Sequence, residues 1–185
     1  MRVEATDLPG VLIVQPDRFG DSRGFLMETY HRARYAEHGI GADFVQTNAS
    51  LSSRGVLRGL HFQSPRAQGK LVSVLQGEIF DVAVDIRLGS PTFGKWLGVL
   101  LSEGNRKQIY IPPGFAHGFC VIADRSLVAY GCTDYYVREA EWALSWSDPA
   151  IGIAWPFAEP ILSDRDARAP TLSQFDQARL PKFHG

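Results

Sequence analysis

The stretch KLVSVLQGEIFDVAVDIR, residues 70–87, contains two apolar, β-branched runs separated by a glycine. Successive side chains of a strand point to opposite faces, so alternation along the sequence predicts which residues share a face. In the second run, one face carries apolar side chains only: Phe80, Val82, Val84 and Ile86. The opposite face carries Asp81, Ala83 and Asp85. The stretch therefore predicts two strands and a hairpin that turns near Gln76 and Gly77.

Most of the remaining chain follows the same pattern, with short strand-like runs between Gly and Pro residues. Further strands are predicted within GVLIVQP (10–16), GDSRGFLMETY (20–30), FVQTNASLS (44–52), GVLRGLHFQ (55–63), WLGVLLS (96–102), RKQIYIP (106–112), FAHGFCVIA (115–123) and SLVAYGCTDYYV (126–137). One helix is predicted over HRARYAEHGI (31–40), with Gly39 at its C-terminal end. Many short strands and few helices indicate a mainly β fold, either a sandwich or a barrel.

The chain of 185 residues has the usual length of a single domain. The predicted strands end near residue 138, and beyond them Leu172, Phe175 and Leu180 recur at roughly helical spacing. We therefore expect one domain over residues 1–185. Its β-core would cover about residues 1–138, and a short helical appendix over about 139–185 would pack on that core.

The composition excludes several classes of protein. A net charge of −1 gives no global field that would attract nucleic acid or an acidic membrane surface. No uninterrupted apolar run approaches the ~20 residues of a membrane span, and the N-terminus has acidic residues where a signal peptide would have its apolar core. Cys120 and Cys132 do not form the pattern of a disulfide framework, although they leave one bridge open. We expect a soluble, cytoplasmic protein that binds neither nucleic acid nor membranes.

The segment RGLHFQ, residues 58–63, places His61 in an apolar run, and a metal ligand is one reading of it. Metal sites of the cupin jelly-roll kind use two histidines two residues apart, a carboxylate nearby, and a later histidine after a Pro-Gly turn. Here Gln63 occupies the second position, Lys70 follows where the carboxylate would be, and only His117, just after Pro113-Gly114, matches. An amide and an ammonium are poor transition-metal ligands, so the sequence disfavours a metal.

A catalytic base is the second reading of His61, because histidine suits proton transfer near neutral pH. Lys70 could stabilise an oxyanion, Tyr130 could donate a proton, and Asp166 could orient the imidazole. Such a set suits proton abstraction beside a carbonyl. From the residues alone, a hydrogen-bonded core histidine is the simpler reading.

Long segments of the chain resemble the dTDP-4-dehydrorhamnose 3,5-epimerase family, in the order that the family has them. These are LPGVLIVQPDRFGDSRGFLMETY, FVQTNAS, GVLRGLHFQ, AQGKLVSVLQGEIFDVAVDIRLGSPTFGKW, IPPGFAHGF, CTDYY, SDPAIGIAWP and ILSDRDA. The resemblance implies a cupin-type jelly roll, usually a homodimer with an exchanged N-terminal strand, and a reaction without metal or organic cofactor. The implied substrate is a dTDP-linked 4-keto-6-deoxyhexose, whose C3 and C5 hydrogens are acidified by the 4-keto group.

The same resemblance implies a role for each site residue. His61 matches the family's base and Asp166 its partner in a dyad, Lys70 matches the residue that stabilises the enolate oxygen, and Tyr130 matches the acid that reprotonates from the other face. The residues that match nucleotide contacts are Phe19 near the thymine, Arg23 and Arg58 at the diphosphate, and the pocket residues Glu28, Gln46, Asn48, His117 and Tyr136. Arginine suits this task because its planar fork reaches phosphate oxygens in pairs.

Two features leave questions open. Arg58 and His61 are three residues apart, so an ideal strand sends them to opposite faces unless Gly59 holds a bulge or Arg58 serves a neighbouring subunit. The chain also departs from common family residues at Thr47, Ala49, Pro113 and Gly131. The expected reaction inverts both C3 and C5. There are two alternative reactions, inversion of only one centre and 3,4-ketoisomerisation. The chain could also be a non-catalytic sugar-nucleotide binder or a metal-dependent cupin.

Overall fold

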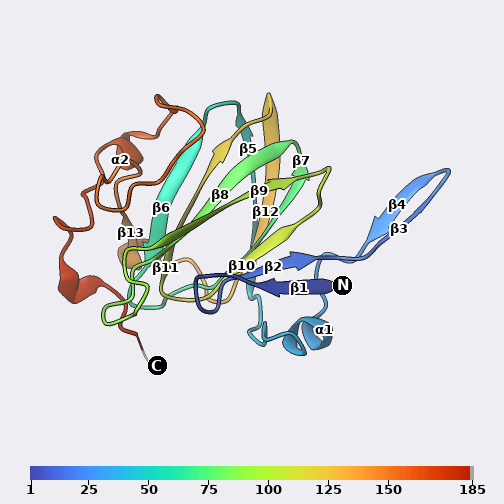
Figure 1. Ribbon diagram of the computed structural model, residues 1–185, viewed down its shortest axis with the longest axis horizontal. Helices are drawn as coiled ribbons and strands as arrows, with labels where there is room; N and C mark the ends of the chain where they lie inside the picture. The colour runs from blue at the N-terminus through green and yellow to red at the C-terminus, as the bar shows by residue number, and fades with distance from the viewer. Residues whose placement is uncertain (184–185) are drawn as a thin grey trace.

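The strands form two antiparallel sheets and a separate ribbon in the computed structural model, which describes residues 1–183 (Figure 1). One sheet has six strands, in the order β1 (Arg2–Ala5), β2 (Leu12–Gln15), β10 (Gln108–Ile111), β7 (Lys70–Gln76), β12 (Arg125–Cys132) and β5 (Gln46–Ser53). The other has five, in the order β13 (Glu141–Ala143), β6 (Leu57–Gln63), β11 (Phe115–Val121), β8 (Glu78–Asp85) and β9 (Trp96–Ser102). The ribbon consists of β3 (Arg18–Asp21) and β4 (Gly24–Met27). This arrangement confirms the predicted mainly β fold.

The strands β7 and β8 have the predicted positions, but they do not form a hairpin. β7 pairs with β10 and β12, whereas β8 pairs with β11 and β9 in the other sheet. The chain crosses between sheets at Gly77, where φ is +83° and an added Cβ would lie 2.3 Å from the carbonyl oxygen of Arg125. A side chain has no room there, so Gly77 permits a sharp change of sheet rather than a hairpin turn.

Both faces of β8 are buried, each in a different apolar cluster. Ala83 belongs to the core between the two sheets, together with residues such as Val72 and Val128 of the opposite sheet. The predicted apolar face packs on the outside of the five-stranded sheet, where Val82 and Val84 contact a cluster that includes residues after 143. The face assignment is therefore confirmed, and the C-terminal part of the chain covers the outer face.

The C-terminal part contains little helix. A further strand, β13, lies beyond residue 138, and the only α-helix described there is α2 (Asp164–Ala167). Leu172, Phe175 and Leu180 are buried, but they lie in turns and next to the 3-10 turn at Gln177–Arg179, not on one helix. Their spacing suggested a helix because buried turns can repeat at similar intervals. The helix predicted over 31–40 is present as α1 (Arg32–Ala36).

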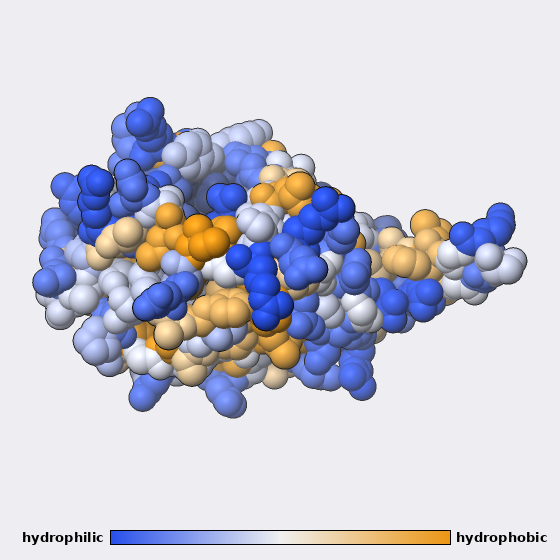
Figure 2. All heavy atoms as spheres, turned by 90° about the horizontal axis from the view of Figure 1, so that it is seen from above, coloured by the Kyte–Doolittle hydropathy of each residue, from blue (hydrophilic) through white to orange (hydrophobic). Residues whose placement is uncertain are grey.

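The β3–β4 ribbon projects from the body on the side opposite α2 (Figure 1), and Figure 2 shows the same projection in space-filling form, with apolar residues along it. Phe19, Phe25 and Leu26 on this ribbon are mostly exposed. Cys120 and Cys132 are free, buried thiols. Within residues 1–183, no helix is long and apolar enough to cross a membrane.

Candidate active site

His61 of β6 and Asp166 of α2 form a hydrogen-bonded pair beside the five-stranded sheet. His61 Nε2 lies 2.6 Å from Asp166 Oδ1, and Asp166 is only 4% exposed. Ser163 caps α2 by accepting a hydrogen bond from the backbone N–H of Asp166, at 3.1 Å, which fixes the start of the helix. Burial raises the pKa of Asp166, but the hydrogen bond and charge of His61, together with hydrogen bonds from Ser163 and the backbone of Gly59, hold that pKa below its usual range. The pair therefore has the geometry of a base with a charged, oriented partner.

Arg58 and His61 line the same cavity because β6 contains a bulge at Gly59. In the register with β11, Arg58 lies opposite Phe119 and His61 opposite His117, so three residues of β6 span two of β11. Gly59 has φ of +134°, and an added Cβ would lie 2.5 Å from the Cα of β11's glycine. The bulge predicted as one option is present, and the cavity needs no Arg58 from a neighbouring subunit.

This cavity has a volume of about 320 Å³ and opens between β6 and the segment before α2. Its lining consists of Val56, Leu57, Arg58, His61, Ile161, Leu162, Ser163, Arg165 and Asp166. Arg58 donates from Nε to Ser52 Oγ at 3.0 Å, which leaves the outer nitrogens of its guanidinium for another partner. A histidine–carboxylate pair and two arginines in one cavity suit an anionic ligand that undergoes proton transfer.

Lys70 and Tyr130 lie in the opposite, six-stranded sheet, on β7 and β12. Burial lowers the pKa of Lys70, and the charges of Cys132, Asp81 and Glu141 offset part of that shift. Burial also raises the pKa of Tyr130, which keeps the phenol protonated at neutral pH. The six-stranded sheet thus carries Lys70 and Tyr130, and the five-stranded sheet carries His61.

His117 forms a second buried pair with Asp81, inside the structure. His117 Nε2 lies 2.9 Å from Asp81 Oδ2, and both side chains are buried. Burial lowers the pKa of His117, Asp81 raises it, and the charges of Lys70 and His61 lower it further. Asp81 was not a predicted site residue, although a carboxylate facing the core between Phe80 and Val82 was the signal that could have identified it.

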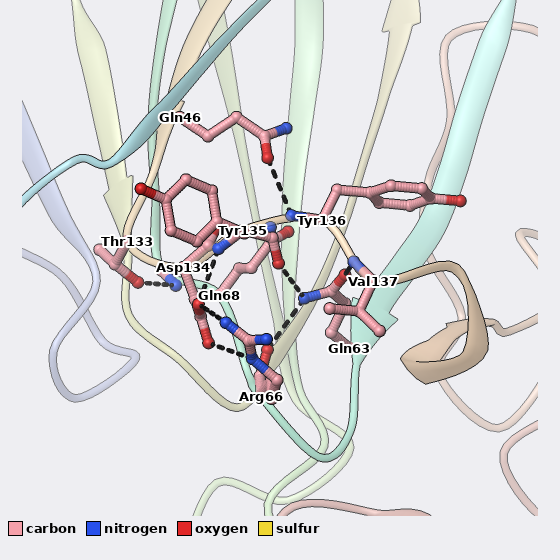
Figure 3. Close-up of polar contacts among 10 residues, drawn as sticks. Gln46, Gln63, Arg66, Gln68, Thr133, Asp134, Tyr135, Tyr136 and Val137 are labelled. Carbon is pink, nitrogen blue, oxygen red and sulfur yellow. Dashed lines mark hydrogen bonds and ion pairs between the residues drawn. The ribbon is translucent and has the colours of Figure 1, made fainter.

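Three predicted pocket residues meet at the ends of β5 and β12. Gln46 donates to Asn48 Oδ1 at 3.1 Å. Its side-chain oxygen accepts from the backbone N–H of Tyr136 at 2.8 Å (Figure 3). The ring of Tyr136 is half exposed, and its hydroxyl donates to Glu141 at 2.9 Å. Arg165, which lines the His61 cavity, also pairs with Glu141. Glu141 and Arg165 connect the tyrosine to the cavity, and no local pattern in the sequence marks either of them.

The structure keeps three other predicted contacts away from this cavity. Phe19 and Arg23 lie on the projecting ribbon, where Arg23 pairs with Asp21. Glu28 follows the ribbon and pairs with Arg34 of α1. Within a single copy of the chain, none of the three lines the His61 cavity.

The donor set around His61 does not favour a metal ion. Gln63 uses its amide groups in hydrogen bonds to the protein backbone. Over residues 1–183, no cluster of three or more His, Cys, Asp or Glu side chains could hold a metal ion.

Comparison with known proteins identifies similar chains. A family model described as dTDP-4-dehydrorhamnose 3,5-epimerase matches residues 5–174. The protein of that name from Neisseria gonorrhoeae is 53% identical over 181 residues, which cover 97% of this chain and 55% of the relative, so the chain spans about half of that relative's length. The one from Shigella flexneri is 52% identical over 168 residues, or 90% of this chain and 93% of the relative. A crystal structure of dTDP-6-deoxy-D-glucose-3,5-epimerase from Legionella pneumophila, in complex with dTDP-4-keto-L-rhamnose, is similar with a TM-score of 0.97 and 50% identity, over 100% of this chain and 99% of that one.

Proposed function

Since the chain belongs to the dTDP-4-dehydrorhamnose 3,5-epimerase family, we propose that it is an isomerase that inverts C3 and C5 of dTDP-4-dehydro-6-deoxy-D-glucose. The product is dTDP-4-dehydro-L-rhamnose. The observation that carries the proposal is the His61–Asp166 pair, at 2.6 Å, in a cavity with Arg58. Because the reaction only moves protons, the proposal requires neither a metal ion nor an organic cofactor.

His61 acts as the base in the proposed mechanism. The 4-keto group acidifies the hydrogens on C3 and C5, so an imidazole beside either carbon can remove a proton. The electrons of the broken C–H bond move onto the keto oxygen and give an enolate. Asp166 holds the imidazole ring in place and stabilises the imidazolium that forms.

Lys70 and Tyr130 complete the reaction from the other sheet. The ammonium of Lys70 stabilises the negative enolate oxygen. Tyr130 has a raised pKa and so carries a proton to return to the carbon. Since His61 lies on β6 and Tyr130 on β12, removal and return of the proton take place from different sides, which inverts the centre.

In this proposal, the nucleotide binds between Arg58 and the half-exposed Tyr136. In the proposal, Arg58 binds the diphosphate, with Arg165 beside it in the cavity. Tyr136 offers a half-exposed ring to the thymine, and Gln46 and Asn48 provide polar contacts next to it. His117 faces the sugar from β11.

Two copies of the chain form the complete enzyme in this proposal. Phe19, Arg23 and Glu28 match nucleotide contacts, yet the ribbon that carries the first two projects away from the cavity of its own chain (Figure 1). A second copy would receive them. The outer face of the six-stranded sheet offers a surface for it, because exposed Leu51 and Leu75 lie beside an apolar depression of about 210 Å³.

Three of the departures from common family residues, Thr47, Ala49 and Gly131, do not reach the cavity. Thr47 lies opposite Gly131, and Ala49 opposite Ala129, in the β5–β12 register. Alternation places these residues on the outer face of the sheet, away from the face of Tyr130. An added Cβ at Gly131 would lie 3.0 Å from Phe44 on that outer side. This placement supports inversion of both centres, because the substitutions leave the inward-facing residues unchanged.

Heavy water tests the proposed function. Incubation of the protein with dTDP-4-keto-6-deoxyglucose in D₂O, followed by NMR, should give deuterium at C3 and C5 and the L-rhamno product. Deuterium at one carbon only would indicate a single-centre epimerase, and a ketone moved to C3 would indicate a ketoisomerase. A folded protein that exchanges neither hydrogen would refute the proposal. His61→Ala should abolish the exchange.

A further inference from the structure

Gln63 is a buried glutamine whose amide is hydrogen-bonded to the backbone of two loops, the one after β6 and the one after β12. It is 4% exposed. Its Nε2 donates to the carbonyl oxygens of Arg66 at 2.9 Å and Tyr135 at 3.2 Å, and its Oε1 accepts from the N–H of Val137 at 2.7 Å (Figure 3). Two of these three partners are the immediate neighbours of Tyr136.

The loop that carries Tyr136 is held by hydrogen bonds to side chains: at its start Thr133 Oγ1 accepts from the N–H of Gly69 at 2.7 Å, and Gln68 donates to the carbonyl oxygen of Asp134 at 2.8 Å. Residues 133–137 belong to no strand or helix. The N–H of Tyr136 donates to Gln46 Oε1 at 2.8 Å, so two glutamines hold three successive residues of the loop. Figure 3 shows the ring of Tyr136 pointing away from this cluster of backbone contacts. The amides fix the backbone, while the ring, whose hydroxyl donates to Glu141 at 2.9 Å, remains half exposed and can contact a ligand.

Gln63 also belongs to the strand that carries the base. His61 and Gln63 are two residues apart on β6, so their side chains share a face. β6 is held on both sides, by β11 and by β13. The distance between the imidazole of His61 and the ring of Tyr136 is therefore set through one rigid strand and one amide.

We propose that Gln63 is a positioning residue that holds Tyr136 at a fixed distance from His61. This inference rests on the proposed function, in which Tyr136 contacts the thymine and His61 reaches the sugar. When Tyr136 binds the thymine at one end of the substrate, C3 and C5 of the sugar at the other end lie beside the imidazole of His61. A small misplacement at a reacting centre lowers the rate strongly, so this alignment contributes to turnover as well as to binding.

Glutamine is the side chain that this position requires. The site offers two carbonyl acceptors and one N–H donor, which match two N–H donors and one oxygen of the amide. Gln63→Glu keeps the size and the acceptor, but it replaces both donors with an oxygen that faces two carbonyl oxygens. Gln63→Met keeps the volume and removes all three hydrogen bonds.

The experiment measures the affinity for dTDP by calorimetry, and deuterium incorporation from D₂O into dTDP-4-keto-6-deoxyglucose, for both variants. We expect each variant to bind dTDP at least tenfold more weakly than the wild type and to exchange more slowly at saturating substrate. Gln15→Glu is the matched control, because Gln15 also donates to a backbone carbonyl, that of Asn105 at 3.1 Å, far from the cavity. It should match the wild type in both measurements.

A double-mutant cycle separates positioning from general stability. Tyr136→Leu removes the ring that Gln63 is proposed to place, so adding Gln63→Glu to it should weaken dTDP binding less than twofold further. A tenfold loss that persists in the Tyr136→Leu background would overturn the inference. So would wild-type affinity in the folded Gln63 variants, or failure of both variants to fold. If the wild-type protein itself neither binds dTDP nor exchanges hydrogen, the proposed function fails instead.

Discussion

The substitution Asp166→Asn isolates the charge of the proposed dyad. In the wild-type protein, His61 Nε2 lies 2.6 Å from Asp166 Oδ1. Asparagine keeps the shape of the side chain and an oxygen that can face His61 Nε2. It removes the negative charge, which the wild-type protein retains at neutral pH because the pKa of Asp166 is held low. The imidazolium that forms when His61 takes a proton then loses its charged partner.

The size of the effect follows from burial and distance. A hydrogen bond to a charged group contributes about 1.5–3 kcal/mol, and Asp166 is 4% exposed, so water compensates little of the loss. Each ~1.4 kcal/mol in the barrier changes a rate tenfold, so deuterium exchange should slow roughly 10- to 150-fold. The affinity for dTDP should not change, because Asp166 contacts His61 and not the residues proposed to bind the nucleotide.

The assay is exchange at C3 and C5 in D₂O, measured by NMR on each carbon separately, with dTDP affinity measured on the same preparation. Asp164→Asn is the control, since Asp164 lies on the same helix with a side chain that is 96% exposed and only a 3.6 Å ion pair to Arg168. It should exchange at the wild-type rate. A folded Asp166→Asn protein that exchanges at the wild-type rate would refute the dyad.

Four further perturbations test other parts of the site. Because burial lowers the pKa of Lys70 below 10.5, turnover should fall with rising pH before that value as the ammonium loses its proton, and Lys70→Arg should remove this alkaline limb from the pH–rate profile. Tyr130→Phe should slow formation of the inverted product more than deuterium exchange, as NMR of both would reveal; equal losses would contradict its role as the returning acid. Gly59→Ala should destabilise the fold by about 2–5 kcal/mol in urea titration, because φ is +134° and the new Cβ would lie 2.5 Å from a backbone Cα. Mixing inactive Arg23→Ala and His61→Ala proteins under conditions of subunit exchange should restore about a quarter of the wild-type activity, since each mixed dimer regains one of two sites; no recovery would contradict sharing of the ribbon.

The sequence predicts the strands of this fold better than their partners. Alternation along residues 78–86 identifies β8 and its two faces, because that signal depends only on neighbouring residues. The pairing of β7 with β10 and β12 depends on residues far along the chain, and no local pattern distinguishes a hairpin from a crossing at Gly77. At the C-terminus, Leu172 donates its N–H to the buried carboxylate of Asp148, a tertiary contact that holds a turn where spacing suggested a helix.

For the candidate site too, the sequence predicts local features better than contacts between distant residues. RGLHFQ is enough to select His61 as a polar residue that needs an explanation, and to identify Gly59 as the place for a bulge. Asp166 lies 105 residues further on, so from the residues alone it was only one candidate partner for the imidazole, and the family resemblance was needed to assign it that role. Glu141 and Arg165 were missed because charged residues are common along the chain, and their significance lies only in their contact with Tyr136 and the cavity.

In the proposed mechanism, the two-sheet architecture suits inversion of two centres that flank one ketone, with one set of residues. C3 and C5 both flank the C4 ketone, so deprotonation at either carbon places negative charge on the same oxygen. A single ammonium, that of Lys70, can therefore serve both half-reactions without moving. Inversion further requires that the proton leaves one face of the sugar and returns to the other, and β6 and β12 belong to different sheets. What must change between the two centres is only the pose of the sugar between His61 and Tyr130. In the proposed mechanism, a nucleotide held firmly at one end, through Arg58 and the Tyr136 loop, permits that small rotation without release of the substrate.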